Sequence, residues 1–414
     1  MSDRPPLCCD EPTFASPTRG EGRSRTLLGR RSQSLLPMSL EHIQHGSRDS
    51  VPSNGTTSSA TALFRGWWAT SLGQMIPTSS QGGALSVMSY NILAGCYVHS
   101  DKYPDCPPWA LGDDYRAKNI LAEVHGCDAD IVTFQEISFS MFSNFIGKEL
   151  ERVGYHGNFE PITGAAGEAC HISPSSGETK SDIEGLAIFF KTSRFKLVEM
   201  TPLKFNAIAA RDVSIPERDK GKVMPKSHNI ALIGVLECFV TESIVIAATT
   251  HASYTKPECQ MYQARKLMMN LTSIKDMFSS STKRVRTLLL GDFNAPPGSD
   301  SVEYFLGTRP RRVSALSYTG ITKNKNTEED SSCCCSSSTI TFDSAYTEYL
   351  QSNPHDVTAV NPSQGGVGAV IDHIFFDELR CIAVCKLAKV ETCSSIPNVC
   401  VPSDHFPVAA MFIP

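Results

Sequence analysis

The sequence predicts an α/β protein in which two packed mixed β-sheets are flanked by helices. Three observations support this fold class. Short apolar segments of strand length recur along the chain, amphipathic helical segments alternate with them, and a hydrophobic share of 41% suffices for a large core. The formal net charge of −5 over 414 residues excludes a polycation that coats nucleic acid with its whole surface. Any phosphate-binding surface must therefore be local.

The first 80 residues differ in composition from the rest of the chain. They are rich in Ser, Thr, Pro, Gly and Arg and carry few periodic apolar positions. We expect a disordered arm over residues 1–80 and one catalytic domain over residues 84–414. Two polar stretches inside that domain, 164–181 and 322–338, are expected to be surface insertions. The adjacent Cys333, Cys334 and Cys335 lie in the second stretch, where a solvated loop is favoured over a metal site.

Cysteine usage and the chain start indicate the compartment. The 15 cysteines include no C-x-x-C pair, and no apolar stretch approaches the roughly 18 residues of a membrane-spanning helix. Asp3 and Arg4, without an apolar region after them, do not resemble a secretory signal. We therefore expect a cytoplasmic protein with reduced thiols and no membrane span. A nuclear or a mitochondrial location stays open, although acidic residues argue against an Arg-rich mitochondrial presequence.

Strands are expected where apolar residues form short runs bounded by polar or turn residues. In chain order these runs cover residues 85–91, 130–135, 186–190, 195–200, 230–236, 244–250, 287–292, 371–376, 382–390 and 408–412.

Helices are expected where apolar residues recur every three or four positions. The segment 113–125 has this spacing through Tyr115, Ile120 and Val124, and 139–153 continues it after the second strand. The longest helix is expected over 260–278, with Leu267 and Leu271 on one face, and a short one over 299–306.

Polar side chains gather at the ends of the predicted strands. They are Asn91, Glu136, His251, Asp292 and Asn294 after strands, and Asp372, Asp404 and His405 before them. Each of them alone has a structural explanation as a turn, a helix cap or a core residue. Asp372 is the hardest to explain in that way, because a carboxylate among apolar neighbours needs a partner such as a histidine or a metal. Together these residues would form an acidic site suited to Mg²⁺.

Taken in order, these segments resemble the endonuclease/exonuclease/phosphatase superfamily, and within it the branch of carbon-catabolite-repressor-type deadenylases, nocturnin and 2′-phosphodiesterases. The resemblance covers residues 84–414. It rests on Met88–Leu93, Tyr103–Leu111, Asp114–Arg116, Asp128–Ile131, Gln135–Glu136, Glu184–Lys191, His228–Ala231, Thr250–His251, Gly291–Asn294, Val302–Tyr304, Asp343–Tyr346, Ile371–Phe375 and Pro402–Pro407. It implies a DNase I-like four-layer sandwich.

The resemblance also implies residue roles. Glu136 is the principal Mg²⁺ ligand, with Asn91 beside it and Asp404 in the metal shell, and Mn²⁺ is the expected substitute. Asp292 orients or deprotonates the attacking water. Asn294, His251 and His405 contact the phosphate, and Asp372 sets the tautomer of His405. Substrate contacts are implied at Arg116, Asn229 and Pro257.

Four positions depart from the family pattern. Thr249 stands where this branch has Asn, and His373 where it has Tyr. One extra residue lies between His251 and Pro257. An aromatic residue that stacks a nucleobase in deadenylases is replaced by Val367 or a nearby glycine. The loss of stacking would weaken adenine preference and leave hydrolysis unaffected.

Three functions are compared. We expect a magnesium-dependent 3′-to-5′ exoribonuclease of the poly(A)-deadenylase type that acts on single-stranded RNA 3′ ends. The alternative is a phosphatase or phosphodiesterase on a small nucleotide, such as a dinucleotide 2′-phosphate or 2′,5′-oligoadenylate. An RNA-binding protein without catalysis is disfavoured, because Glu136, Asp292 and His405 are all present. The leucine-rich repeats that dock some relatives into a deadenylase complex do not occur in this sequence, so partners in a complex stay open.

Overall fold

A computed structural model describes residues 65–77, 83–163, 183–279, 282–308, 340–361, 366–389 and 395–414. All of them belong to one structural unit, Leu40–Pro414. The expected insertions 164–181 and 322–338, with Cys333–Cys335, lie outside the described residues, as do residues 1–64 of the expected arm. None of the helices within the described ranges combines the length and the hydropathy of a transmembrane segment.

Seven strands form the first sheet, in the order β1–β15–β17–β2–β3–β5–β4. Their bounds are β1 Trp67–Ala69, β2 Leu85–Asn91, β3 Ile131–Ser138, β4 Tyr155–Pro161, β5 Glu184–Lys191, β15 Arg380–Cys385 and β17 Val408–Ile413. The neighbours β2 and β3 are parallel, and all other neighbours in this sheet are antiparallel. The sheet is therefore mixed, as the sequence predicts.

Six strands form the second sheet, in the order β10–β14–β9–β8–β7–β6. Their bounds are β6 Phe195–Lys204, β7 Ile230–Cys238, β8 Ser243–His251, β9 Val285–Asp292, β10 Asp343–Ser344 and β14 Asp372–Asp377. Here β8 and β9 form the parallel pair. Two small ribbons pair β11 Asp356–Val357 with β16 Ala388–Lys389, and β12 Ala359–Asn361 with β13 Val367–Ala369.

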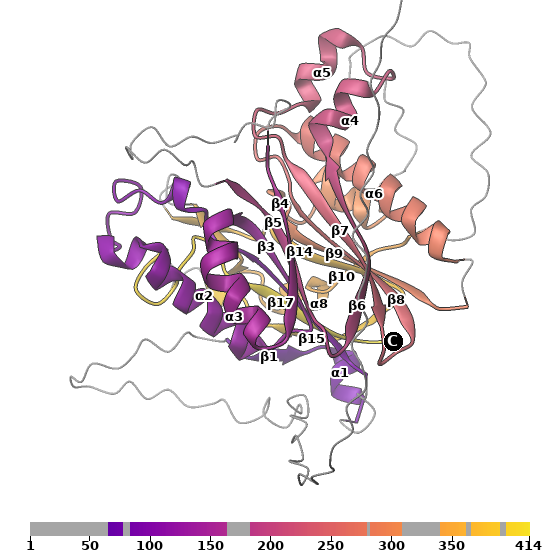
Figure 1. The fold of residues 1–414 in the computed structure, drawn as a ribbon, viewed down its shortest axis with the longest axis horizontal. Coiled ribbons are helices and arrows are strands. Elements are labelled where there is room, and N and C mark those ends of the chain that lie inside the picture. The colour runs from indigo at the N-terminus through magenta and orange to yellow at the C-terminus, as the bar shows by residue number, and fades with distance from the viewer. Residues whose placement is uncertain are drawn as a thin grey trace, which may run out of the picture. The chain divides into compact units, whose positions relative to one another are not determined.

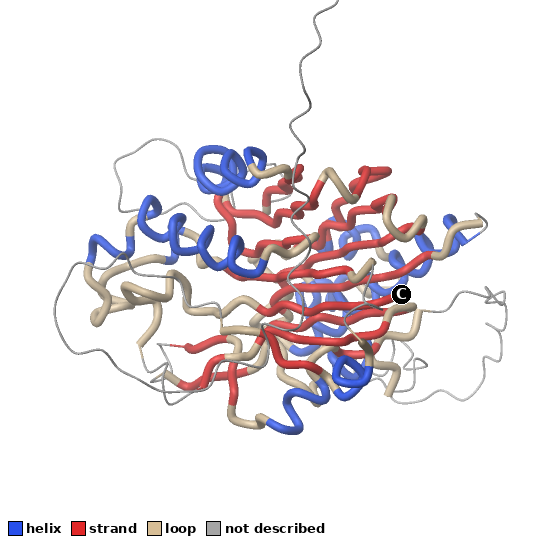
Figure 2. The backbone as a smooth tube through the Cα atoms, turned by 90° about the horizontal axis from the view of Figure 1, so that it is seen from below, coloured by secondary structure: helices blue, strands red, loops and turns tan. Residues whose placement is uncertain are grey.

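Helices cover the outer faces of both sheets (Figures 1 and 2). On the seven-stranded sheet lie α2 Asp113–Cys127, α3 Gly147–Arg152 and a π-helix, Met141–Ile146. On the six-stranded sheet lie α6 Pro257–Ser279 and α7 Asp300–Phe305. The remaining helices are α1 Ser71–Met75, α4 Phe205–Arg211, α5 Glu217–Val223, α8 Thr347–Ser352 and two short 3₁₀ helices, Gly95–Tyr97 and Pro108–Leu111.

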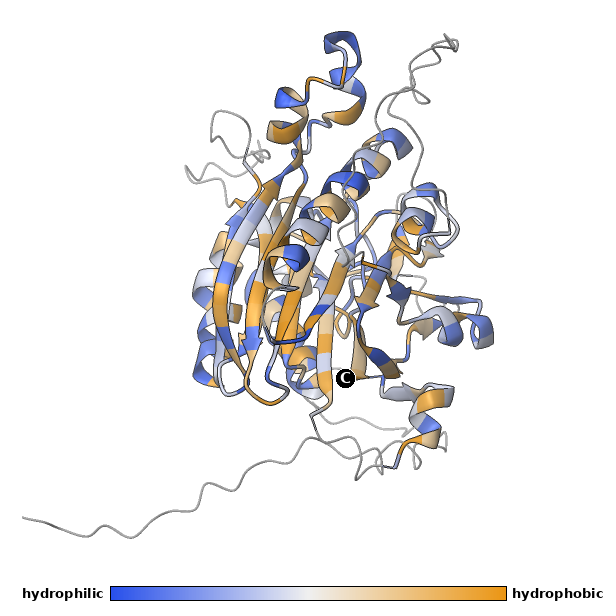
Figure 3. Cartoon of the chain, turned by 90° about the vertical axis from the view of Figure 1, so that its right-hand side faces the viewer, coloured by the Kyte–Doolittle hydropathy of each residue, from blue (hydrophilic) through white to orange (hydrophobic). Residues whose placement is uncertain are grey.

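Alternation along the strands divides the core into layers. In β9, Leu288 and Leu290 pack between the two sheets, whereas Leu289 packs on the side of α6 with Leu267. Successive side chains of a strand point to opposite faces, so a strand that is apolar throughout must be covered on both faces. Figure 3 shows the hydrophobic colour concentrated on the strands. This four-layer arrangement fixes the strand ends relative to one another.

The folded part begins earlier in the chain than the composition predicts. Residues 65–77 fall inside the arm that was expected to be disordered, yet they form β1 and α1. In β1, Trp67–Ala69 pairs with Ala383–Cys385 of β15, and the Thr70 hydroxyl caps α1 by accepting from the Gly73 amide at 3.0 Å. A three-residue strand has too few positions to show a period of two. Its partner lies more than 300 residues away, so the local pattern could not reveal it.

Candidate active site

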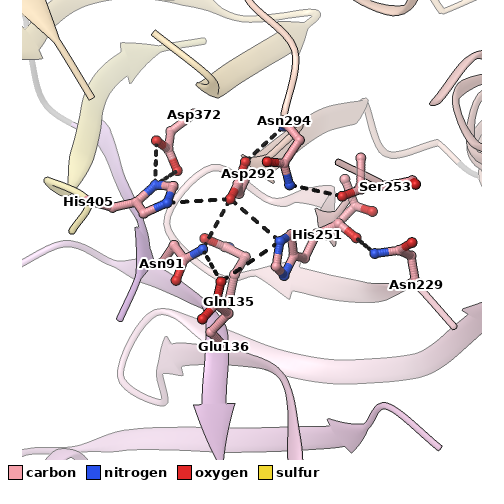
Figure 4. A network of polar contacts seen from close by, with 12 residues as sticks. Asn91, Gln135, Glu136, Asn229, His251, Ser253, Asp292, Asn294, Asp372 and His405 are labelled. Carbon is pink, nitrogen blue, oxygen red and sulfur yellow. Dashed lines mark hydrogen bonds and ion pairs between the residues drawn. The ribbon is translucent and has the colours of Figure 1, made fainter. Parts of the chain in front are cut away.

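The site lies where the two parallel strand pairs end (Figure 4). In one sheet Asn91 at the end of β2 lies opposite Gln135 of β3, and in the other His251 at the end of β8 lies opposite Asp292 of β9. Parallel neighbours deliver their carboxyl ends to the same edge of a sheet. The two sheets are packed face to face, so residues from four strand ends meet in one place.

A β-bulge presents Glu136 to this site. The pairing of β3 with β5 shifts register between Phe134 and Ile137, and Glu136 has a φ of +52°. A left-handed backbone at a non-glycine residue is strained and is retained where the surrounding structure enforces it. The Ala94 amide donates to Glu136 Oε2 at 3.1 Å and holds the carboxylate in place.

Asp292 is the centre of the polar network. Its Oδ2 lies 3.0 Å from Asn91 Nδ2, 3.6 Å from His251 Nε2 and 3.7 Å from His405 Nε2. Its Oδ1 accepts a hydrogen bond from the backbone amide of Asn294 at 2.8 Å. The side chain is only 2% exposed, so its charge depends on these neighbours rather than on solvent.

The turn after Asp292 needs a close approach of backbones. Gly291 has a φ of +145°, and a Cβ there would lie 2.1 Å from the Thr250 carbonyl oxygen, so no other residue fits without a shift. Asn294 follows with a φ of +48°, and its Nδ2 donates to the Ala252 carbonyl at 3.0 Å. The side-chain NH2 of Asn294 is thus bound to the backbone beside His251, and the contact of Asn294 with the phosphate stays a prediction.

Asn91 joins two carboxylates across the sheets. Its Nδ2 donates to Glu136 Oε1 and to Asp292 Oδ2, each at 3.0 Å, while its Oδ1 accepts from the Leu93 amide at 3.1 Å. Two carboxylates that converge on one donor form a set of hard oxygen ligands, and a divalent cation is the group that balances such a set. The carboxylate oxygens at this site therefore fit a bound cation.

His405 and Asp372 form a buried pair. Nδ1 of His405 lies 3.0 Å from Oδ2 and 3.2 Å from Oδ1 of Asp372. Burial by itself lowers the pKa of His405, but the carboxylates of Asp372 and Asp292 raise it well above its ordinary value. The Asp372 backbone amide and its preceding neighbour both donate to the Thr358 hydroxyl, which fixes the start of β14. The imidazolium form of His405 is therefore favoured.

His251 and Glu136 form the accessible side of the site, with side chains 14% and 12% exposed. The His251 Nε2 lies 4.0 Å from Glu136 Oε1. Behind His251, Asn229 is 3% exposed and donates from Nδ2 to the His251 carbonyl at 3.0 Å. Asn229 therefore orients His251, and the predicted contact of Asn229 with substrate is replaced by this buried backbone contact.

Arg116 is not a substrate contact. Its side chain is fully buried and donates from Nε to the Pro402 carbonyl at 2.8 Å and from Nη2 to the carbonyls of Ile92 and Leu93. It thereby ties the segment after Asn91 to the segment before Asp404. The sequence-based prediction was wrong because the position in a motif does not reveal which side of the sheet a helix residue faces.

The two remaining predicted residues lie at the margin of the site. Asp404 Oδ2 accepts from the Tyr103 hydroxyl at 2.9 Å, and the Asp404 charge contributes to the raised pKa of His405. Pro257 is exposed at the first position of α6.

Sequence reasoning did not assign a role to Glu184. This residue begins β5, is 6% exposed, and accepts a hydrogen bond at Oε1 from the Tyr97 hydroxyl at 2.9 Å. Burial first, and then the charge of Glu136, raise the pKa of Glu184 to about 7. The sequence signal that could have identified Glu184 is its position directly before an apolar run of strand length.

Thr249 and His373, which depart from the family pattern, both make buried hydrogen bonds. Gln135 is fully buried and its Nε2 donates to the Thr249 hydroxyl at 2.8 Å, which links the two sheets beneath the site. His373 is 4% exposed, and its Nε2 lies 2.8 Å from the Ala295 carbonyl oxygen. Burial lowers the pKa of His373 to about 4, so it is a neutral donor that holds the turn carrying Asn294.

These contacts indicate which side chains could hold a cation. Among the described residues, Asp292, Asp372 and His405 offer atoms within 4.8 Å of one another. Asp372 and His405, however, already satisfy each other by their hydrogen bond. Glu136, which faces Asp292 across Asn91 and has none of the described histidines within hydrogen-bond distance, is the better oxygen ligand for a divalent ion.

Comparison with known proteins agrees with this geometry. A model of the endonuclease/exonuclease/phosphatase family matches residues 88–405. The CCR4-NOT transcription complex subunit 6-like protein of Danio rerio is 28% identical over 373 residues, which cover 81% of this chain and 63% of that protein. The CCR4-Not complex 3′-5′-exoribonuclease subunit Ccr4 of Yarrowia lipolytica is 27% identical over 353 residues, 79% of this chain and 47% of that protein. The chain thus spans about half to two thirds of the length of these relatives.

A solved structure shares the fold. The crystal structure of ANGEL2, a 2′,3′-cyclic phosphatase, superposes with a TM-score of 0.61 at 22% identity, over 84% of this chain and 98% of that one. Its likeness confirms the predicted pair of mixed sheets flanked by helices. The family match contains every strand end of the site, from Asn91 to His405, and most of the chain, so the protein belongs to the endonuclease/exonuclease/phosphatase family.

Proposed function

We propose that the chain is a magnesium-dependent 3′-to-5′ exoribonuclease of the deadenylase type that hydrolyses the phosphodiester bonds of mRNA tails. The relative from Yarrowia lipolytica carries the name of a 3′-5′-exoribonuclease, and the relative from Danio rerio that of a subunit of the same complex, which supports this reaction class. Single-stranded RNA ends are the proposed partner, and the cytoplasm is the proposed compartment.

One observation carries the proposal. Two carboxylates, Glu136 and Asp292, face each other across the Asn91 side-chain amide, and the imidazole of His405, whose pKa is raised, points at the same Asp292 oxygen. Phosphodiester hydrolysis requires negative groups to hold a cation and orient water, and positive groups to bind the phosphate. This arrangement supplies both within one hydrogen-bonded network.

Glu136 would hold the Mg²⁺ ion, with Asn91 beside it and Asp404 at the outer shell. Bound Mg²⁺ supplies a positive charge that polarises the phosphate oxygens. The Ala94 amide and Asn91 Nδ2 both donate to the Glu136 carboxylate and fix its orientation. A preformed ligand lowers the reorganisation that binding requires. Mn²⁺, which takes similar oxygen ligands, is the expected substitute.

Asp292 would orient the attacking water and accept its proton. The backbone amide of Asn294 donates to Asp292 Oδ1 and fixes it. The other oxygen, Oδ2, faces the reacting centre and is surrounded by Asn91 and the two imidazoles. His405 would donate from Nε2 to a non-bridging oxygen, with Asp372 holding Nδ1. His251 would bind another phosphate oxygen from the accessible side. Together these groups stabilise the charge that develops on the phosphate.

The alternative reaction acts on a small nucleotide or on a phosphorylated RNA end. The exposed Val367 motivates it, because this aliphatic side chain is 59% exposed, and Val367 or a nearby glycine stands where the family resemblance implies an aromatic stacking residue. An aliphatic residue at that position offers no face for base stacking. The name of ANGEL2 adds a 2′,3′-cyclic phosphate end as a substrate to test.

A cleavage ladder separates these reactions. The protein is incubated with Mg²⁺ and 5′-labelled RNAs that end in adenosines, in uridines or in a 2′,3′-cyclic phosphate, and in parallel with a dinucleotide 2′-phosphate and 2′,5′-oligoadenylate. We expect a stepwise ladder from the 3′ end of the RNAs, abolished by a chelator and restored by excess Mg²⁺. Cleavage of the small nucleotides alone, or removal of the cyclic phosphate without a ladder, would show that the exoribonuclease proposal is wrong.

A further inference from the structure

The residues just before the family match form part of the site's support. The match begins at residue 88, whereas β1 and α1 cover residues 67–75. The strand β1 is the edge of the seven-stranded sheet and pairs with β15, and the Lys386 amide donates to the Gly66 carbonyl at 3.0 Å. This ladder places Arg65 at a defined position beside the segment that carries His405.

Arg65 contacts that segment in three ways. Its Nη2 donates to the Pro407 carbonyl at 2.7 Å, and its Nε donates to the Lys386 carbonyl at 2.8 Å. Its guanidinium carbon lies 5.1 Å from the centre of the Phe406 ring, which is a cation–π distance. The guanidinium thus joins Lys386, the residue after β15, to the two residues that directly follow His405.

The other side of the segment around His405 is held by β12 and by Thr358, the residue before β12. The Val360 amide donates to the Asp404 carbonyl at 2.9 Å, and the Phe406 amide donates to the Thr358 carbonyl at 2.7 Å. His405 itself forms a bridge with Ala359. The regular pairing of β17 begins only at Val408. The carbonyl of Pro407, just before that strand, is where Arg65 supplies a donor.

We propose that Arg65 is a positioning residue for His405. It fixes the Phe406–Pro407 segment from the side opposite Thr358–Val360, and thereby sets the 3.7 Å distance between His405 Nε2 and Asp292 Oδ2. The proposal rests on the proposed function in that His405 binds the phosphate. A misplacement of about 1 Å in such a group costs up to about 10²-fold in rate.

The chemistry requires arginine at this position. Two nitrogens of one planar group reach carbonyls of two chain segments, at the residue after β15 and at the residue before β17, while the guanidinium carbon lies 5.1 Å from the centre of an aromatic ring. A lysine ammonium can donate to one of these carbonyls but cannot span both and stack at the same time. Arg65→Lys is therefore expected to restore only part of the function that Arg65→Ala loses.

Arg380 offers a matched control on the same pair of strands. Its Nε and Nη2 donate to the backbone oxygen of Pro414 at 3.2 and 3.0 Å, at the opposite end of β17 from His405. Arg380→Ala removes an arginine contact to a backbone oxygen beside the same two strands without touching the His405 segment.

The test compares Arg65→Ala, Arg65→Lys and Arg380→Ala in the full chain. We expect Arg65→Ala to lower kcat by about 10-fold or more with KM changed less than about 2-fold, Arg65→Lys to lie between it and the wild type, and Arg380→Ala to match the wild type. Added guanidine should restore part of the activity of Arg65→Ala. Equal loss in Arg65→Ala and Arg380→Ala would overturn the proposal, as would unchanged kcat in Arg65→Ala.

A second readout needs no substrate. The proton between His405 and Asp372 is followed by proton NMR and assigned by its loss in His405→Ala. Its resonance should shift or broaden in Arg65→Ala and stay in place in Arg380→Ala. A wild type that cleaves no RNA would defeat the proposed function, yet this resonance would still report whether Arg65 positions His405. An unmoved resonance in Arg65→Ala would defeat the positioning role alone.

Discussion

His405 and Asp372 are paired through Nδ1 at 3.0 Å, which leaves Nε2 of His405 directed at the site, 3.7 Å from Asp292. The pair lies at the junction of β14 and the segment before β17, and both side chains are buried. A buried carboxylate at this distance favours the protonated imidazole, so His405 carries a positive charge where a phosphate would be bound.

Asp372→Asn should change the pH dependence of turnover. In the wild type the pKa of His405 is raised by Asp372 and Asp292, so the imidazole stays protonated through neutral pH. Without the Asp372 charge that pKa falls. The variant should therefore lose kcat by on the order of 10²-fold at neutral pH and regain part of it as the pH falls from about 8 to about 6. The measurement is kcat as a function of pH for Asp372→Asn and the wild type, with the exposed Asp343→Asn as the control. The same pH dependence in Asp372→Asn and the wild type would contradict the prediction.

Glu136→Gln should remove activity while the fold persists. One of the two facing carboxylates is lost, so the cation has a weaker site, and we expect kcat/KM to fall by on the order of 10³-fold, about 4 kcal/mol of transition-state stabilisation. The residue lies on a bulge at a strand end, so unfolding should change little. Activity and thermal unfolding are measured with and without Mg²⁺. The exposed Glu151→Gln is the control, and full activity of Glu136→Gln would refute its role as metal ligand.

His373 should make stability depend on pH. Its pKa in the folded protein is about 4, below the ordinary value of 6.5. The unfolded chain therefore binds a proton that the folded chain does not, and stability present above about pH 6.5 is lost as the pH falls toward 4, by up to roughly 3 kcal/mol. Urea unfolding between these pH values should show a shallower slope for His373→Phe than for the wild type or for the exposed His99→Phe. Equal slopes would show that His373 does not titrate in this way.

Arg116→Lys should lower stability and leave substrate affinity unchanged. Lysine cannot serve the carbonyls of Pro402, Ile92 and Leu93 together, and an unsatisfied buried acceptor is costly, so we expect a loss of about 2–4 kcal/mol in the free energy of unfolding. The folded fraction should keep its KM, because Arg116 is fully buried. The exposed Arg152→Lys should unfold like the wild type. A raised KM with unchanged stability would restore Arg116 as a substrate contact.

The sequence by itself determined the long apolar strands and the polar residues at their ends, but not short or partly polar strands such as β1 and β4. Runs such as Leu288–Leu290 are apolar on both faces, which predicts a strand that is buried on both faces. A carboxylate such as Asp292 close behind such a run is costly to bury unless a cation or a hydrogen-bond donor pairs with it. These are local properties of period and hydropathy. For that reason Asn91, Asp292 and His405, and the family motif to which they belong, can be identified from the sequence alone.

The tertiary structure alone decided which of these side chains face the site and which support it from behind. The left-handed backbone of Glu136 arises from a register shift against β5, and the burial of Arg116 arises from contacts with Pro402 almost 300 residues away. Arg65 lies in a segment whose composition predicts disorder, yet it bonds to Pro407 across 342 positions. Such contacts depend on how the two sheets pack, and neither periodicity nor composition within a short window carries that information.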